Sequence, residues 1–284
     1  MTAVLSERSR TRATAPLGRL VAAELRWVLR RPRTLVVLGL LALIPVAVAI
    51  GIALAGSPSS GRGPGLVAQV AGNGFVLPVV ALGLALTLLL PLAVASSAAD
   101  AIAGEASTGT LRGLLLAPVG RMRLVVMKSA GVITVAVLAV VIVAVVGMVA
   151  GAVVVGGPGS LITLSGTTLG FGEALGRIAL VAAWTIGQLL AVGAVALAIS
   201  TFTEHPLVVL ASVLGGMIVF GVLGAIPSLS WLQPLLLTSG FTAGTDVLRD
   251  PLPLDGIASS SLRALVYVVV GMTITVVRMR RRDA

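Results

Sequence analysis

The 284-residue sequence contains no cysteine, one histidine and one lysine. The absence of cysteine excludes disulfides, thiolate metal sites and cysteine nucleophiles. His205, in a short polar turn, has no companion for binding a metal or activating a serine, so we expect neither a metal site nor an intramembrane enzyme. The phosphate-binding loop of ATPases requires Gly-x-x-x-x-Gly-Lys-Ser/Thr, but Met127 precedes Lys128, the sole lysine. Any ATP hydrolysis that serves this chain is therefore expected in another protein, and no cofactor is expected in the chain itself.

Charged residues are also scarce, at 11% of the sequence, whereas 57% of the residues are hydrophobic and the mean hydropathy is +1.12. A bilayer core about 30 Å thick needs roughly 20 consecutive apolar residues in a helix. Six stretches meet this length, and the sixth fits least well because Arg263 lies near its start. They are residues 35–55, 75–95, 130–155, 178–199, 206–226 and 257–277. The sequence predicts an all-α polytopic membrane protein with six transmembrane helices, in a transmembrane domain over residues 34–278.

The basic residues are unevenly distributed around these spans. Sixteen of the twenty Lys and Arg residues lie before the first span, in the loop 99–128, or at Arg278 and in the basic tail 279–284. Because basic residues in short loops stay on the cytoplasmic side, we expect both termini and the loop 99–128 in the cytoplasm. The net charge of +10 then reflects topology and attraction to anionic membrane lipids rather than nucleic-acid binding.

The segment before the first span divides into a disordered tail, residues 1–15, and an amphipathic helix over residues 16–33. This helix has arginines on one side and leucine and valine on the other, which is typical of a helix lying in the membrane interface. Glu24 falls in the middle of the apolar side, where an unpaired charge would be costly. We expect it to have a partner, either Arg31 in the same helix or a basic residue or backbone donor of the loop 99–128.

The loop 99–128 carries the most specific pattern in the chain. Gly104 and Gly109 permit sharp changes of direction, and a short helix is predicted to follow with an apolar side that needs a covering surface. Residues at fixed spacing along the loop are Ile102, Glu105, Gly109, Thr110, Leu111, Leu114, Leu115, Pro118, Arg121 and Lys128.

This loop resembles that of permease subunits of ABC-2 type exporters, which commonly reads I-x-x-E-x-x-x-G-T-L-x-x-L-L-x-x-P-x-x-R and is followed by a lysine. All ten positions above match the pattern. The chain departs from it at Ala106 and Arg112, where the family often carries Arg and Glu. Glu24 lies in a second stretch, before the first span, that is similar to the family.

The resemblance implies that the loop contains a coupling helix, which docks on a separate ABC ATPase. Two ATPase copies, which bind ATP and Mg, and a second permease subunit, identical or related, are implied as partners. The residues implied in coupling are Glu105, Gly109, Thr110, Leu111, Leu114, Leu115, Pro118 and Arg121. The implied function is that of an exporter subunit in a bacterial plasma membrane, and the alternative is a non-transporting membrane anchor or sensor that recruits an ATPase.

The first five predicted spans contain no charged residue, and this limits the class of substrate. Ion and proton pumps usually carry ionisable residues inside their spans, so a lipophilic or amphipathic substrate such as a drug, lipid or peptide is favoured. Thr87, Thr185 and Gln188 are candidates for lining its path, although Gln188 could instead hydrogen-bond a neighbouring helix. The outer loop 228–256 contains an apolar run too short to cross the membrane, which predicts a re-entrant segment or an interfacial loop anchored by Trp231.

Overall fold

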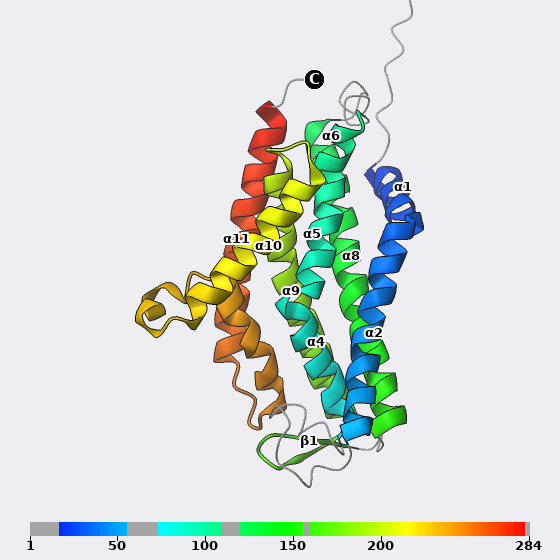
Figure 1. Ribbon diagram of the computed structural model, residues 1–284, viewed down its shortest axis with the longest axis vertical. Coiled ribbons are helices and arrows are strands. Elements are labelled where there is room, and N and C mark those ends of the chain that lie inside the picture. The colour runs from blue at the N-terminus through cyan, green and yellow to red at the C-terminus, as the bar shows by residue number, and fades with distance from the viewer. Residues whose placement is uncertain (1–16, 56–72, 110–119, 156–159, 282–284) are drawn as a thin grey trace, which may run out of the picture.

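The computed structural model describes residues 17–55, 73–109, 120–155 and 160–281 (Figure 1). Within these ranges, six helices are long and apolar enough to cross a membrane, which confirms the prediction of an all-α polytopic membrane protein. They are Pro32–Leu54, Leu89–Ser107, Arg121–Val155, Phe171–Ser200, Pro206–Ala225 and Asp255–Arg281. The only sheet in the described ranges is an antiparallel pair, β1 (Ser160–Ile162) and β2 (Thr168–Gly170), at one end of the bundle.

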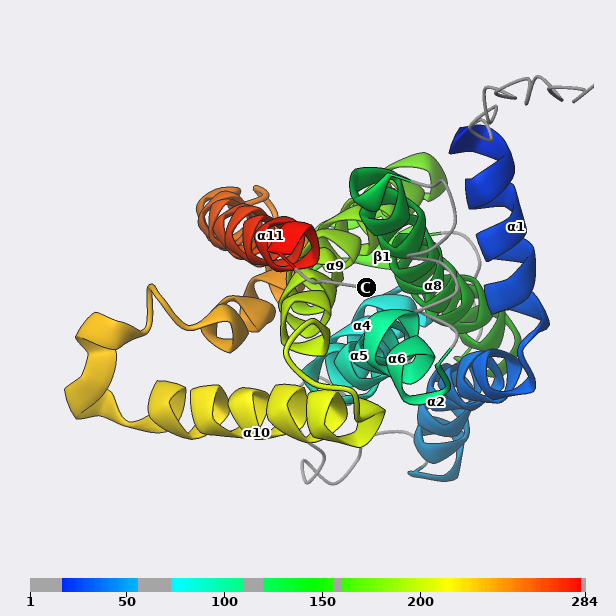
Figure 2. The ribbon, with the colours of Figure 1, turned by 90° about the horizontal axis from the view of Figure 1, so that it is seen from above.

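Helix α1 (Leu17–Arg30) lies along the side of the bundle, next to α8 and near the end opposite the strands, as Figures 1 and 2 show. The chain then turns at Arg31 into α2 (Pro32–Ala55), where a proline in the first turn costs no helical hydrogen bond. The last turns of α11 lie at this same end, which we call the α1 end (Figure 1). The orientation of α1 is the one expected of an interfacial helix.

The second span differs from its prediction as one helix over residues 75–95. Helical structure runs from Gly74 to Ser107 but breaks at Leu88, whose φ of −149° and ψ of −50° are not helical. The break lies just before Pro91, which has no N–H to donate to the carbonyl of Thr87 and whose ring clashes with that carbonyl. The pieces are η1 (Gly74–Val76), α4 (Leu77–Thr87), α5 (Leu89–Ala99), the π-helix η2 (Asp100–Gly104) and α6 (Glu105–Ser107).

The third helix, α8 (Arg121–Ala150), continues as the π-helix η3 (Gly151–Val155). The connection between the second and third spans is therefore confined to residues 108–120, shorter than the predicted loop 99–128. Helix α9 (Phe171–Ser200) packs against α5, α8 and α11 (Asp255–Arg281) and forms the centre of the bundle. Helix α10 (Pro206–Ala225) tilts strongly away from the other spans and is the least buried of the six (Figures 1 and 2).

The segment between the last two spans folds back onto the bundle. It contains η4 (Pro227–Leu232) and η5 (Leu237–Leu248), and η5 packs against α4, α9 and α11. Arg263 of α11 donates a hydrogen bond to the carbonyl of Leu236 at 2.7 Å, and Tyr267 donates to the carbonyl of Leu235 at 2.8 Å. Trp231 remains 70% exposed. These contacts hold the middle of the segment against α11, and the choice between a re-entrant segment and an interfacial loop stays a prediction.

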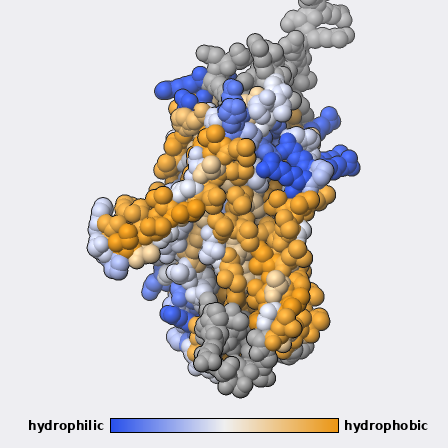
Figure 3. Space-filling view, in the orientation of Figure 1, coloured by the Kyte–Doolittle hydropathy of each residue, from blue (hydrophilic) through white to orange (hydrophobic). Residues whose placement is uncertain are grey.

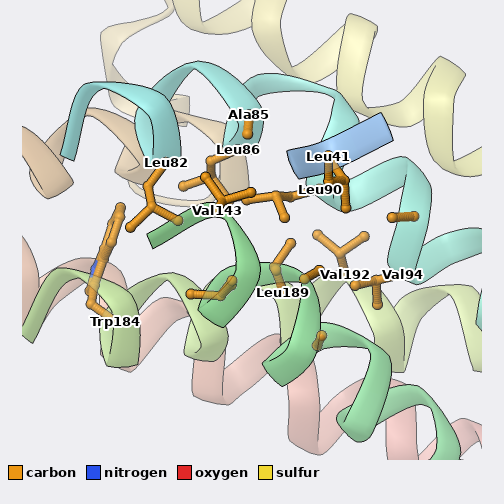
Figure 4. Close-up of a cluster of buried hydrophobic side chains, with 14 of the residues drawn as sticks. Leu41, Leu82, Ala85, Leu86, Leu90, Val94, Val143, Trp184, Leu189 and Val192 are labelled. Carbon is orange, nitrogen blue, oxygen red and sulfur yellow. The ribbon is translucent and has the colours of Figure 1, made fainter. Parts of the chain in front are cut away.

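The core is built from aliphatic side chains of α2, α4, α5, α8 and α9, together with Trp184 (Figure 4). Small residues allow the helices to approach closely at its edges. A Cβ atom at Gly271 of α11 would lie 2.7 Å from the backbone of Ala194 in α9, and one at Gly147 of α8 would lie 2.8 Å from the backbone of Pro78. Such contacts are typical of helix packing in lipid, where small residues line the interfaces.

Gly271→Ala is therefore expected to destabilise the protein by about 1–3 kcal/mol, because α11 must move away from α9 to accept the added methyl group. The matched control is Gly187→Ala in α9, where an added Cβ meets nothing within 4 Å. Thermal unfolding of the two variants in the same detergent provides the comparison. Equal midpoints for Gly271→Ala and the wild type would show that the close α9–α11 approach does not contribute to stability.

Candidate functional site

Lys128 lies about two turns into α8 and is only 2% exposed. A buried ammonium group needs charged or polar partners. Its Nζ donates hydrogen bonds to Glu24 of α1, at 3.0 Å from Oε1 and 3.2 Å from Oε2, and to Glu105 Oε1 of α6. Both carboxylates are themselves buried, with Glu24 8% and Glu105 7% exposed. The three side chains, which we call the buried triad, tie α1, α6 and α8 together.

The triad identifies the partner that the sequence predicts for Glu24. Its partner is Lys128, at the end of the segment 99–128, and not Arg31. Arg31 instead stacks on the ring of Trp27, with its guanidinium carbon 3.2 Å from the ring centroid, and Lys128 Nζ lies 5.4 Å from the same centroid. Trp27 therefore adds cation–π attraction beside the triad.

A second ionic cluster lies where α1 joins α2. Asp100, at the end of α5, accepts hydrogen bonds from Arg31 at 3.4 Å and from Arg33 at 3.2 Å. Partial burial lowers the pKa of Arg31 from its ordinary value, whereas the negative charge of Asp100 raises it, and the guanidinium stays charged. The two clusters together link the α1–α2 junction to the end of the second span and the start of the third.

The backbone between the clusters is irregular. Residues 100–104 form a π-helical turn, a feature often found at functional sites. The N–H of Ala103 donates to the hydroxyl of Ser200 at the end of α9, at 2.9 Å. Gly109 then takes the left-handed conformation, with φ of 73°, and its N–H bonds the carbonyl of Ala106, which ends the helix where the loop begins.

The structure describes only some of the predicted coupling residues. Glu105 is in the triad, Gly109 ends α6, and Arg121 begins α8 and donates to the backbone carbonyl of Arg280 in α11. The other predicted coupling residues, Thr110, Leu111, Leu114, Leu115 and Pro118, lie outside the described residues.

The candidates for a substrate path do not form a common site. The hydroxyls of Thr87 and Thr185 donate to carbonyls of their own helices, those of Leu84 and Val181. Gln188 is 1% exposed, and neither polar atom of its amide has a hydrogen-bond partner among the residues that the structure describes. The neighbouring-helix hydrogen bond considered for Gln188 is thus not found there.

Sequence reasoning missed Asp100, Arg33 and Trp27 as parts of the site. The available signal for Asp100 was its position, since it is a carboxylate directly following a long apolar run. Its pairing with Arg31 and Arg33 could not be read from the sequence, because these residues are almost seventy positions away.

A bundle of six membrane-crossing helices, with a surface helix and buried ion pairs at one end, defines a polytopic membrane protein. The family model described as ABC-2 family transporter protein matches residues 20–193, more than half of the chain, and the chain belongs to this family. No curated protein matches the sequence. The match runs from α1 into α9, includes the whole triad, and confirms the resemblance seen in the loop. Permeases of this family typically work with an ABC ATPase subunit.

Replacing Lys128 by methionine is expected to cost about 3–5 kcal/mol in the free energy of unfolding, because it leaves two buried carboxylates without their cation. Combining Lys128→Met with Glu24→Gln and Glu105→Gln removes that unpaired charge and should restore most of the loss. Arg26→Met, at an exposed position of α1, is the control. The thermal unfolding midpoints of Lys128→Met, of the triple variant and of Arg26→Met are measured in detergent. A Lys128→Met protein as stable as Arg26→Met would contradict the ion pairing in the buried triad.

Proposed function

We propose that the chain is the permease subunit of an ABC exporter, which moves a lipophilic or amphipathic substrate outward with energy from ATP hydrolysed by a separate subunit. Its partners would be two copies of an ABC ATPase, which bind ATP and Mg, and a second permease subunit. The α1 end would face the cytoplasm of a bacterial cell, with both termini on that side of the plasma membrane.

The observation that carries this proposal is the buried triad. The loop 108–120 leaves the bundle after Ser107 of α6 and returns at Arg121 of α8, and the triad joins these two helices to α1. A force on the loop would therefore act on both spans and on the interfacial helix together. In this account α1, α6 and α8 move as one body when the ATPase moves the loop.

The loop itself supplies the docking surface in this proposal. Thr110, Leu111, Leu114, Leu115 and Pro118 would form the coupling helix that fits the ATPase, as the family pattern implies. Arg121, through the carbonyl of Arg280, would extend the connection to α11.

The character of the spans supports a lipophilic or amphipathic substrate. In the described spans, the charged side chains lie within about two turns of a helix end. Asp100, Glu105 and Lys128 pair there with opposite charges, and Arg263 donates to the carbonyl of Leu236. A transport path lined by apolar side chains offers few polar groups that could replace the hydration shell of an ion.

The test is co-expression with candidate ABC ATPases, followed by purification of the complex and measurement of its ATPase activity and of substrate-dependent stimulation. Leu114→Asp with Leu115→Asp should abolish co-purification, because charges would replace the apolar docking surface. Glu105→Gln should retain the complex and lower the stimulation, because it weakens the link between loop and spans without changing the docking surface. Glu173→Gln, in the first turn of α9 at the far end of the bundle, is the matched control.

A complex that is unaffected by the leucine double change would contradict docking through the loop. A stable complex whose ATPase activity never responds to substrates, and that moves none in vesicles, would contradict export and support the alternative of a membrane anchor or sensor.

A further inference from the structure

A groove of about 580 Å³ runs between α2, α5 and α10, beginning at Arg33 near the α1 end. Its α2 wall contains residues from Arg33 to Ala47 on one face of the helix, a length of about 21 Å at 1.5 Å per residue. That length exceeds the half-thickness of a bilayer core, about 15 Å. Apart from Arg33 and Ser96, every lining residue is apolar.

A second cavity, of about 530 Å³, lies at the α1 end and shares Arg33 with the groove. Its lining includes Trp27, Arg31 and Asp100. Both arginines pair here with Asp100, and Glu105 in the same lining is paired with Lys128. The side chain of Arg33 is 55% exposed and that of Arg31 only 27%, so Arg33 is the accessible cation. Figure 3 shows hydrophilic residues around α1 directly above the hydrophobic surface of α2.

We propose that this joined space is a binding site for an anionic phospholipid of the leaflet at the α1 end. The phosphate would bind Arg33, the headgroup would occupy the cavity beside Trp27 and Arg31, and one acyl chain would lie in the groove along α2 and α5. The position of the single accessible cation at the polar end of a groove of acyl-chain length matches the chemistry of such a lipid.

A second copy of this chain would fit the site less well. An apolar helix could fill the groove, but it would also need an anion for Arg33. In the described part of the chain, the carboxylates at the α1 end are those of Glu24, Asp100, Glu105 and Glu204, and each already has a partner. A phospholipid supplies its own phosphate.

The test is native mass spectrometry of the full-length chain, titrated in detergent with phosphatidylglycerol or with phosphatidylcholine. Retention of phosphatidylglycerol should exceed that of phosphatidylcholine, and Arg33→Gln should weaken it about fivefold, equivalent to about 1 kcal/mol. Arg19→Gln, which removes an exposed cation of α1 outside both cavities, should leave retention unchanged.

The apolar part of the site is tested by a matched pair in α2. Leu40 lines the groove and is 59% exposed, whereas Leu35 is 56% exposed and does not line it. Leu40→Trp should reduce phosphatidylglycerol binding severalfold, and Leu35→Trp should not. The proposal is overturned if neither Arg33→Gln nor Leu40→Trp lowers retention, or if both lipids bind equally. It is also overturned if Leu40→Trp dissociates a dimer while lipid occupancy stays the same, since a second copy would then fill the groove. None of these readouts requires transport, so the site can fail or stand independently of the proposed function.

Discussion

The burial of one ammonium group between two carboxylates is the constraint on which the α1 end depends. Lys128 is the only lysine of the chain, and its position inside the protein is tolerated because Glu24 and Glu105 accept its hydrogen bonds. Neither acid could be buried there alone, and the lysine could not be buried without them. The interfacial helix, the end of the second span and the start of the third are consequently held in one arrangement.

Away from the α1 end, apolar contacts rather than ion pairs hold the helices together. Lipid provides little drive for apolar helices to associate, so α9 holds its neighbours through close contacts at small residues and through the aliphatic core. Helix α10 contacts α5 and α9 but is the least buried of the spans and tilts away from the bundle. The molecule therefore combines a tightly packed body of α4, α5, α8, α9 and α11 with an exposed face formed by α2, α5 and α10, where the groove lies.

Much of the architecture follows from hydropathy alone, because lipid permits few spanning structures other than apolar helices. The misplaced charge of Glu24 was enough to predict a partner, but not to choose between Arg31 and a residue of the loop. That choice depends on how α1 crosses α8, which no periodicity in either helix reveals. Pro91 could indicate a disturbed second span, yet the helical path to Ser107, the tilt of α10 and the pairing of Asp100 with Arg33 result from tertiary packing between distant segments.

The most direct test of the account uses the absence of native cysteine. A Cβ atom at Gly131 of α8 would lie 3.4 Å from the Cγ2 of Val28 in α1, so Val28→Cys with Gly131→Cys can form a disulfide that locks the two helices together. The measurement is substrate-stimulated ATPase activity of the reconstituted complex, before and after oxidation of the same sample. If α1 and α8 move as one body, the locked complex keeps its stimulation. Loss of stimulation on oxidation, with recovery on reduction, would show that α1 and α8 must separate during the cycle and would contradict the account.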